Sequence, residues 1–392
     1  MRNVKNIIIP DGTTNISNYA FKDFSSLVSI AIPESVTSIG CSAFEGCSSL
    51  TSITIPDSIT TIGDSAFTFC NSLTNITIPK SITSIGGNVF SCCSSLTSIT
   101  IPESVTSIGH SAFHNCESLI DITIPESVTS IDGSAFEGCH SLESIIMPER
   151  VQIVGELRFS NCKSLTSIKI PETVTRIGNS AFADCSSLTY IEVPESITII
   201  EEKAFFGCVQ LRNFRISKDI VHIGNDAFGG CKSIEFTVDK ENQYFDIREG
   251  IIYNKNITRI IYIPDFIEEV IIPNTVTELS GFQNNVYIRK VKFQENTSLI
   301  TINENTFSGC TNLTRIVISN GITSIGDSAF RGCRSLISIE IPDSVTSIGD
   351  DAFFGCSSLT SITIPYNVTR IGENTFRGCT SLASITLPDG VT

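Results

Sequence analysis

The chain has 392 residues, with 41 acidic against 26 basic side chains and a formal net charge of −15. A hydrophobic content of 41% with only 17% charged residues excludes a disordered chain. The acidic balance argues against nucleic acid and anionic membrane surfaces, because both are bound through basic patches. No apolar run approaches the about 20 residues of a membrane-spanning helix, and Ile7 to Ile9 alone are too short for a signal-peptide core.

A 23-residue repeat starts near the N-terminus and organises most of the chain. Three residue types recur at this step: Pro from Pro10 to Pro194 and from Pro342 to Pro388, Phe from Phe21 to Phe228 and from Phe307 to Phe376, and Cys from Cys47 to Cys231 and from Cys310 to Cys379. Three independent columns with one period do not arise from composition alone. They indicate a solenoid, in which each coil buries its apolar side against its neighbours.

The unit LTSITIPDSITTIGDSAFTFCNS (residues 50–72) shows what one coil is expected to contain. Its opening L-x-x-I-x-I pattern predicts a short strand with an inward apolar side. Pro56 ends that strand because it has no N–H for a ladder. Two further Ile residues turn inward along the next face. Gly63-Asp64-Ser65 then predicts a turn and a helix N-cap, followed by one short helical or 3-10 turn around Phe67.

The repeat resembles the BspA-like family of leucine-rich-repeat proteins, whose units carry the signature AF-x-GC-x-SL-x-x-I-x-IP. The stretch AFEGCSSLTSITIPDSIT (residues 43–60) matches that signature almost letter for letter. The resemblance covers nearly the whole chain. It implies a leucine-rich-repeat solenoid, with short parallel β-strands on a concave face and short helical or 3-10 turns and loops elsewhere.

The period breaks between Cys231 and Cys310, which lie 79 residues apart, or three periods plus ten. The segment from Val238 to Pro264 alternates and carries turn signals, which predicts one β-hairpin island. The island is similar to an insert common in the same family. We therefore expect three parts: a solenoid block over 1–234, an irregular repeat with the island over 235–300, and a second solenoid block over 301–392.

The Cys column suggests a disulfide or metal site, but burial is the stronger interpretation. Each column Cys follows the Phe of its coil by three residues and therefore points to the same interior, where it acts as a small hydrophobe. Stacked Cβ atoms about 5 Å apart do not suit a disulfide, which needs about 3.8 Å. We expect a column of buried free thiols, with Cys41 and Cys92 outside it as the better candidates for reactivity.

Candidate chemistry is otherwise absent from the sequence. Zinc-type ligand clusters do not occur, and an inward Cys116 leaves its neighbour His114 facing water. No nucleophile elbow, P-loop or dinucleotide motif is found. The sequence therefore predicts no enzyme activity, no metal site and no cofactor.

An acidic residue follows the Pro in most coils, with Lys80 and Tyr366 as exceptions. This acidic column comprises Asp11, Glu34, Asp57, Glu103, Glu126, Glu149, Glu172, Glu195, Asp343 and Asp389. It is either an array for cations or a basic partner, or a solvated turn column that keeps the solenoid soluble. The second interpretation is favoured, because like charges about 5 Å apart in water are tolerated without a ligand.

The exposed strand positions are the best place to look for binding, because packing does not constrain them. In the early coils they are mostly Ser and Thr, as at Thr54 and Thr77, and they diversify later. The candidates are Lys169, Tyr190, Glu192, Arg212 and Arg215 on the strand face, with Tyr244, Tyr253 and Tyr262 in the island. Tyr and Arg commonly anchor interfaces, so we predict one interface formed by this concave patch and the island edge. The alternative for the island Tyr residues is that they pack the hairpin.

The sequence thus predicts a non-enzymatic protein-binding scaffold. The family resemblance implies a surface-associated adhesin or antigen, at the cell surface or secreted, that recognises host matrix proteins or other cells. The alternative is a cytoplasmic protein–protein interaction scaffold, favoured by the reduced thiols and the lack of a recognisable signal peptide. The terminal coils show no polar cap, so we expect either a fragment of a longer chain or ends covered by partners, including other copies of the chain.

Overall fold

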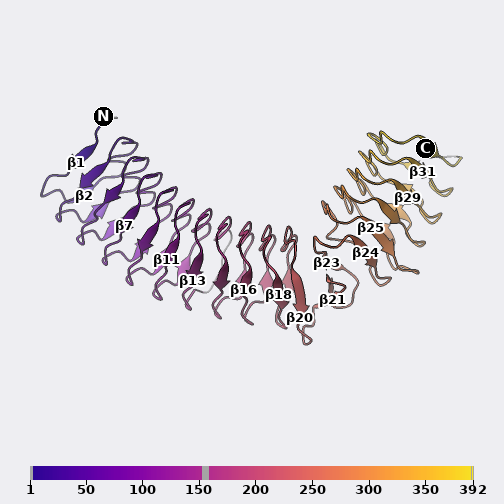
Figure 1. The fold of residues 1–392 in the computed structure, drawn as a ribbon, viewed down its shortest axis with the longest axis horizontal. Coiled ribbons are helices and arrows are strands. Elements are labelled where there is room, and N and C mark those ends of the chain that lie inside the picture. The colour runs from indigo at the N-terminus through magenta and orange to yellow at the C-terminus, as the bar shows by residue number, and fades with distance from the viewer. Residues whose placement is uncertain (1–2, 152–158, 390, 392) are drawn as a thin grey trace. The chain divides into compact units, whose positions relative to one another are not determined.

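The structure of the protein, a computed structural model, describes residues 3–151, 159–389 and 391. It divides into two compact units, unit 1 over Met1–Ile234 and unit 2 over Glu235–Thr392. Each unit is a stack of similar coils, and successive coils pair strand on strand (Figure 1). The fold is a parallel-strand β-solenoid, as the repeat predicts.

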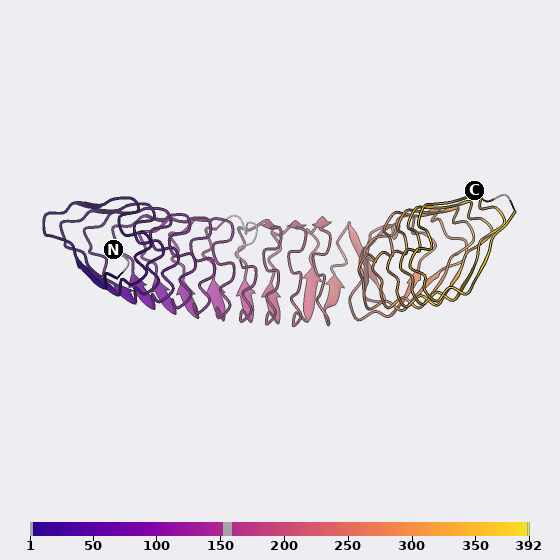
Figure 2. The same cartoon turned by 90° about the horizontal axis from the view of Figure 1, so that it is seen from above.

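Each coil of unit 1 contributes a short first strand, in most of which a buried Ile separates two exposed residues. Neighbouring first strands run parallel and in register, so that Ile76 pairs with Ile99 and Ile99 with Ile122. Figure 2 shows them aligned along one side of unit 1. The first strands of unit 1 are β1 (Asn6–Ile8), β3 (Ser29–Ala31), β5 (Ser52–Ile53), β7 (Asn75–Thr77), β9 (Ser98–Thr100), β11 (Asp121–Thr123), β13 (Ser144–Ile146), β14 (Ser167–Lys169), β16 (Tyr190–Glu192) and β18 (Asn213–Ile216). We call their outward side chains, together with those of the residues just before each strand, the first-strand face.

The inward turn after the Pro contains a second strand of two residues, which the sequence pattern does not reveal. Its buried Ile again stacks on the Ile of the next coil, as Ile85 does on Ile108. The second strands of unit 1 are β2 (Asn15–Ile16), β4 (Ser38–Ile39), β6 (Thr61–Ile62), β8 (Ser84–Ile85), β10 (Ser107–Ile108), β12 (Ser130–Ile131), β15 (Arg176–Ile177), β17 (Ile199–Ile200) and β19 (His222–Ile223).

The third side of each coil is a run of turns, and the prediction of a short helical or 3-10 turn there is wrong: the described residues contain no helix. Alternate N–H groups donate to the next coil, from Ser65 to the Gly87 carbonyl and from Phe67 to the Val89 carbonyl, each at 2.9 Å. The N–H groups between them close i→i−3 turns. A helix would direct these donors along its own axis, so the solenoid ladder replaces it.

The predicted N-cap residue has a related but different role. Asp64 Oδ1 accepts the N–H of Gly87 in the next coil at 2.9 Å. Ser65 adopts the left-handed backbone conformation, with φ of 59°, which breaks any helical progression.

The core consists of side-chain columns that run from coil to coil. The Phe rings stack almost in parallel, with centroids 5.4 Å apart for Phe113 and Phe136 and 5.7 Å apart for Phe136 and Phe159. All the cysteines are free, as predicted, and those of the column are buried except Cys379, which is partly exposed. Each described column thiol also donates a hydrogen bond to the backbone carbonyl of a Phe. That Phe lies 26 residues earlier in the chain, except for Cys310, where the step is 28 residues.

Unit 2 begins with β20 (Glu235–Val238) and the predicted island. The island hairpin is present as β21 (Phe245–Arg248) and β22 (Ile251–Asn254), and β23 (Ile260–Tyr262) adds a third antiparallel strand. Parallel coils then resume with the first strands β24 (Glu269–Ile272), β25 (Lys290–Phe293), β27 (Arg315–Val317), β29 (Ser338–Glu340), β31 (Ser361–Thr363) and β33 (Ser384–Thr386). The second strands are β26 (Thr301–Ile302), β28 (Ser324–Ile325), β30 (Ser347–Ile348) and β32 (Arg370–Ile371).

The first coil after the island does not show the Phe, Cys and Pro of the repeat at the 23-residue step, so the sequence pattern does not identify it. Phe282 takes the place of the column Phe, and Asn285 takes the place of the column Cys. The step from β24 to β25 is 21 residues, from Glu269 to Lys290, and the next step is 25 residues, from Lys290 to Arg315. These two unequal steps place an irregular surface next to β25.

Candidate functional site

The predicted patch in unit 1 lies on the first-strand face, with all five side chains exposed. Parallel pairing sets Lys169 beside Glu192 and Ser167 beside Tyr190. The Tyr190 side chain is 57% exposed on this surface. Charged and aromatic groups therefore stand next to one another where the strands β5, β7, β9 and β11 present Ser, Thr, Asn and Asp.

The acidic column supplies partners for two of these basic residues. Lys169 Nζ lies 3.3 Å from Glu149 Oε1, and Arg215 forms an ion pair with Glu195. All four side chains are about half exposed, so each pair contributes little to stability, on the order of 0–1 kcal/mol. Arg212, in contrast, hydrogen-bonds through Nη2 to Gln210 Oε1 at 3.4 Å.

The structure adds Ile146, which sequence reasoning missed, to this patch. Ile146 pairs with Lys169 and is 76% exposed. A recess of about 350 Å³ surrounds it, between Glu126 and Lys169. The signal was present in the sequence, because Ile146 stands where four preceding coils have Thr.

The island Tyr residues separate into two groups. Tyr244 is 49% exposed, whereas Tyr253 is 2% and Tyr262 8% exposed. Tyr262 packs edge-on against Phe236 at 5.6 Å, and burial raises the pKa of Tyr253 to about 12. Tyr253 and Tyr262 therefore pack the island, as the alternative interpretation has it, and cannot contact a partner in this conformation. The single interface of patch and island edge stays a prediction.

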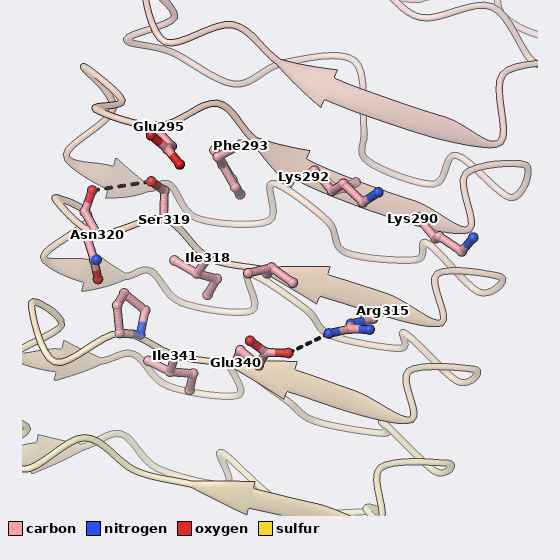
Figure 3. Close-up of a pocket in the computed structure, with 13 residues that line it drawn as sticks. Lys290, Lys292, Phe293, Glu295, Arg315, Ile318, Ser319, Asn320, Glu340 and Ile341 are labelled. Carbon is pink, nitrogen blue, oxygen red and sulfur yellow. Dashed lines mark hydrogen bonds and ion pairs between the residues drawn. The ribbon is translucent and has the colours of Figure 1, made fainter.

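Unit 2 carries the larger hollow, a groove of about 710 Å³ across β25, β27 and β29 (Figure 3). We call it the β27 groove; it extends from Lys290 on β25, past Arg315 on β27, to Pro342 after β29. Phe293, Ile318 and Ile341 lie between a basic end and an end formed by Glu295, Ser319 and Asn320 (Figure 3). No residue of this groove was a candidate from the sequence.

Ion pairs hold the basic end in place. Lys290 Nζ lies 2.5 Å from Glu269 Oε1, and Arg315 Nη2 lies 2.6 Å from Glu340 Oε1. The hydrogen bond and charge of Lys290 lower the pKa of Glu269, with a smaller contribution from Lys292. In the part of the chain that the structure describes, Lys292 and Glu295 have no ion-pair partner.

The buried thiols offer no reactive centre. Burial raises the pKa of Cys93 and of Cys139 to about 12, so both thiols stay protonated at neutral pH. Across residues 3–151, 159–389 and 391, no three His, Cys, Asp or Glu side chains gather as metal ligands would.

The coil pattern has a counterpart in a known family. The family model described as "BspA type Leucine rich repeat region (6 copies)" matches residues 1–120, 106–235, 152–272 and 275–392. The chain belongs to this BspA-type leucine-rich-repeat family.

Two solved structures resemble this BspA-type protein over most of its length. A leucine-rich repeat protein from Bacteroides ovatus is 32% identical, with 91% of this chain and 83% of that chain covered and a TM-score of 0.57. A leucine rich cell surface protein from Faecalibacterium prausnitzii is 30% identical, with 98% and 88% covered and a TM-score of 0.53. No curated protein sequence matches the chain. Among the described residues there is no helix that is long and apolar enough to cross a bilayer.

The BspA-type repeat accounts for the Phe, Cys, Pro and Ile columns of the core. It does not account for the residues on the exposed strand positions, where this chain departs from Ser and Thr. Those departures include residues of the unit 1 patch and of the β27 groove.

Proposed function

We propose that the protein is a non-enzymatic protein-binding scaffold whose first-strand face makes the contacts. The observation that carries this proposal is the change along one exposed row, from Thr54, Thr77, Thr100 and Thr123 to Ile146, Lys169, Glu192 and Arg215. The core does not require such variation, because only inward positions pack. Exposed Tyr and Arg, as at Tyr190 and Arg215, are residue types that anchor protein interfaces.

A finer proposal concerns where the scaffold works. We infer a surface-associated adhesin or antigen that recognises host matrix proteins or other cells. The support is the family and the Faecalibacterium relative, which is described as a cell surface protein.

The alternative, an interaction scaffold in a reducing compartment, draws support from the free cysteines. Labelling intact cells with a membrane-impermeant amine reagent separates the two. Recovery of labelled protein supports the surface assignment, provided that a known cytoplasmic protein of the same cells stays unlabelled. Labelling only after lysis contradicts it.

The binding proposal is tested with the purified full chain against a panel of purified extracellular-matrix proteins, by biolayer interferometry. We expect saturable binding to at least one member, weakened by substitutions on the first-strand face. The matched control carries Thr54→Ala and Thr77→Ala, two changes on the same face where the early coils are uniform. Saturable binding that is lost in the control but retained in patch and groove variants would place the contacts elsewhere.

A further inference from the structure

Two successive coils at the β27 groove lack the Pro of the repeat. By register, Gln294 and Ser319 occupy the positions that Pro273 and Pro342 hold in the flanking coils. In most other coils, as at Pro56 and Pro79, this Pro is buried at the end of the first strand. Without the rings, the surface is hollowed beside Ile318.

The floor of the groove is apolar. Ile318 is buried, while Phe293, Val317 and Ile341 are half-buried and face the opening. Val317 stands between Lys292 and Glu340 in a row where Thr is common, so an apolar group replaces a hydroxyl at an outward-facing, half-buried position. This surface can cover an apolar side chain of about the size of Leu and remove it from water.

The two ends of the groove carry opposite charges. Lys290 and Arg315 are paired with carboxylates, whereas Lys292 forms no ion pair within the described residues and acts on Glu269 only through its charge. Glu295 has no cation at the other end within the described residues. A ligand that lies along the strands therefore meets a positive charge, an apolar floor and a negative charge in that order (Figure 3).

We propose that the β27 groove binds an extended peptide segment of a partner protein in which an acidic residue adjoins an apolar one. The carboxylate pairs with Lys292, and the apolar side chain covers Phe293, Val317 and Ile341. Polar or basic residues of the peptide that follow the apolar side chain lie next to Glu295. The inference rests on the proposed function and specifies the partner chemistry for one part of the first-strand face.

The test uses a phage-displayed library of random short peptides, selected on the full chain. We expect enriched peptides to carry Asp or Glu next to Leu, Ile, Val or Phe. Synthetic copies are then measured by fluorescence anisotropy. Lys292→Glu is expected to weaken binding about tenfold or more, and selection on that variant is expected to enrich Lys or Arg in place of the acid.

A second variant closes the groove with the repeat's own residue. Ser319→Pro restores the missing ring at a position where Pro342 occupies the same register, so the fold is expected to be retained. This variant should lose peptide binding without a lower melting temperature. The matched charge control is Lys80→Glu, which makes the same charge change at an exposed site where other coils already have an acid.

Each outcome bears on the inference. Absence of enrichment, enrichment without an acidic residue, or binding that survives both Lys292→Glu and Ser319→Pro overturns it. Enriched peptides that depend on Tyr190 and Arg212 instead overturn it as well, while leaving the proposed scaffold function intact. Binding weakened equally by Lys80→Glu assigns the effect to net charge and also overturns it.

Discussion

At the scale of single residues, the Cys column shows how a buried polar group is accommodated. Cys70 and Cys93 are buried, and their thiols donate to the Phe44 and Phe67 carbonyls at 3.3 and 3.2 Å. The sequence predicts burial and free thiols correctly, because the Cys follows the Phe at a constant step. It does not predict the hydrogen bond, because the acceptor lies 26 residues away, and only the stacking offset brings it close.

The raised thiol pKa values predict a loss of stability in alkali. A thiol such as Cys139 titrates near pH 12 in the folded chain but at its ordinary value of 9.0 once unfolded. Between pH 9 and about pH 12 the unfolded state therefore binds fewer protons than the folded state, so the free energy of unfolding falls as the pH rises. Below pH 9 the thiol is protonated in both states and has no such effect. Each such thiol lowers the free energy of unfolding by up to about 1.4 kcal/mol per pH unit.

Chemical denaturation of the protein across this pH range measures the slope. A variant with Cys116, Cys139 and Cys162 changed to Ser, which does not titrate, should show a shallower decline than the native chain. An identical decline in the two proteins would contradict the assignment to buried thiols.

Thiol accessibility gives a second expectation at this scale. Cys41 and Cys92 are partly exposed, whereas the column cysteines from Cys47 to Cys356 are buried. A bulky thiol reagent should therefore modify Cys41 and Cys92 first in the native protein, and all 15 cysteines only after denaturation. Peptide mass spectrometry reads the order, and disulfides between successive column members such as Cys116 and Cys139 would refute it.

At the scale of the coil, the sequence predicts what repeats and misses what depends on neighbouring coils. The first strand, its inward Ile and its end at Pro56 follow from local pattern. The helical turn was a wrong prediction, because a local capping signal at Asp64 serves an N–H of the next coil. The β27 groove was missed because no recognisable motif marks it. Its sequence signal is the lack of the repeat's Pro at two positions, which are occupied by Gln294 and Ser319.

The stacked rings determine how strongly one coil depends on its neighbours. Phe136 is fully buried between Phe113 and Phe159, so Phe136→Ala should lower the free energy of unfolding by about 3–5 kcal/mol. Because contacts are mainly between adjacent coils, hydrogen exchange should accelerate most in the coils next to residue 136. Uniform acceleration along unit 1, or a loss below about 1 kcal/mol, would argue against the stacked register.

At the scale of the whole molecule, a uniform core supports a surface that changes from coil to coil. Tyr190→Ala with Arg212→Ala should weaken binding to an identified partner by about 2 kcal/mol or more, because exposed Tyr and Arg anchor interfaces. The melting temperature should stay nearly unchanged, since neither side chain is in the core. Titration calorimetry and thermal unfolding measure the two quantities.

The control pair Thr54→Ala and Thr77→Ala should leave affinity for that partner unchanged. If the control pair abolishes binding while the Tyr190 and Arg212 pair does not, the early coils of unit 1 carry the contacts instead.

The unequal steps at β25 have a consequence for how the chain folds. Coils that are nearly alike can pair one repeat out of place during folding, because most of the same stacking contacts form in the slipped arrangement. The 21-residue and 25-residue steps around Lys290 match no other described step between first strands, so this coil has only one well-fitting pair of neighbours. The same irregularity that opens the β27 groove thus gives unit 2 a reference point against misalignment.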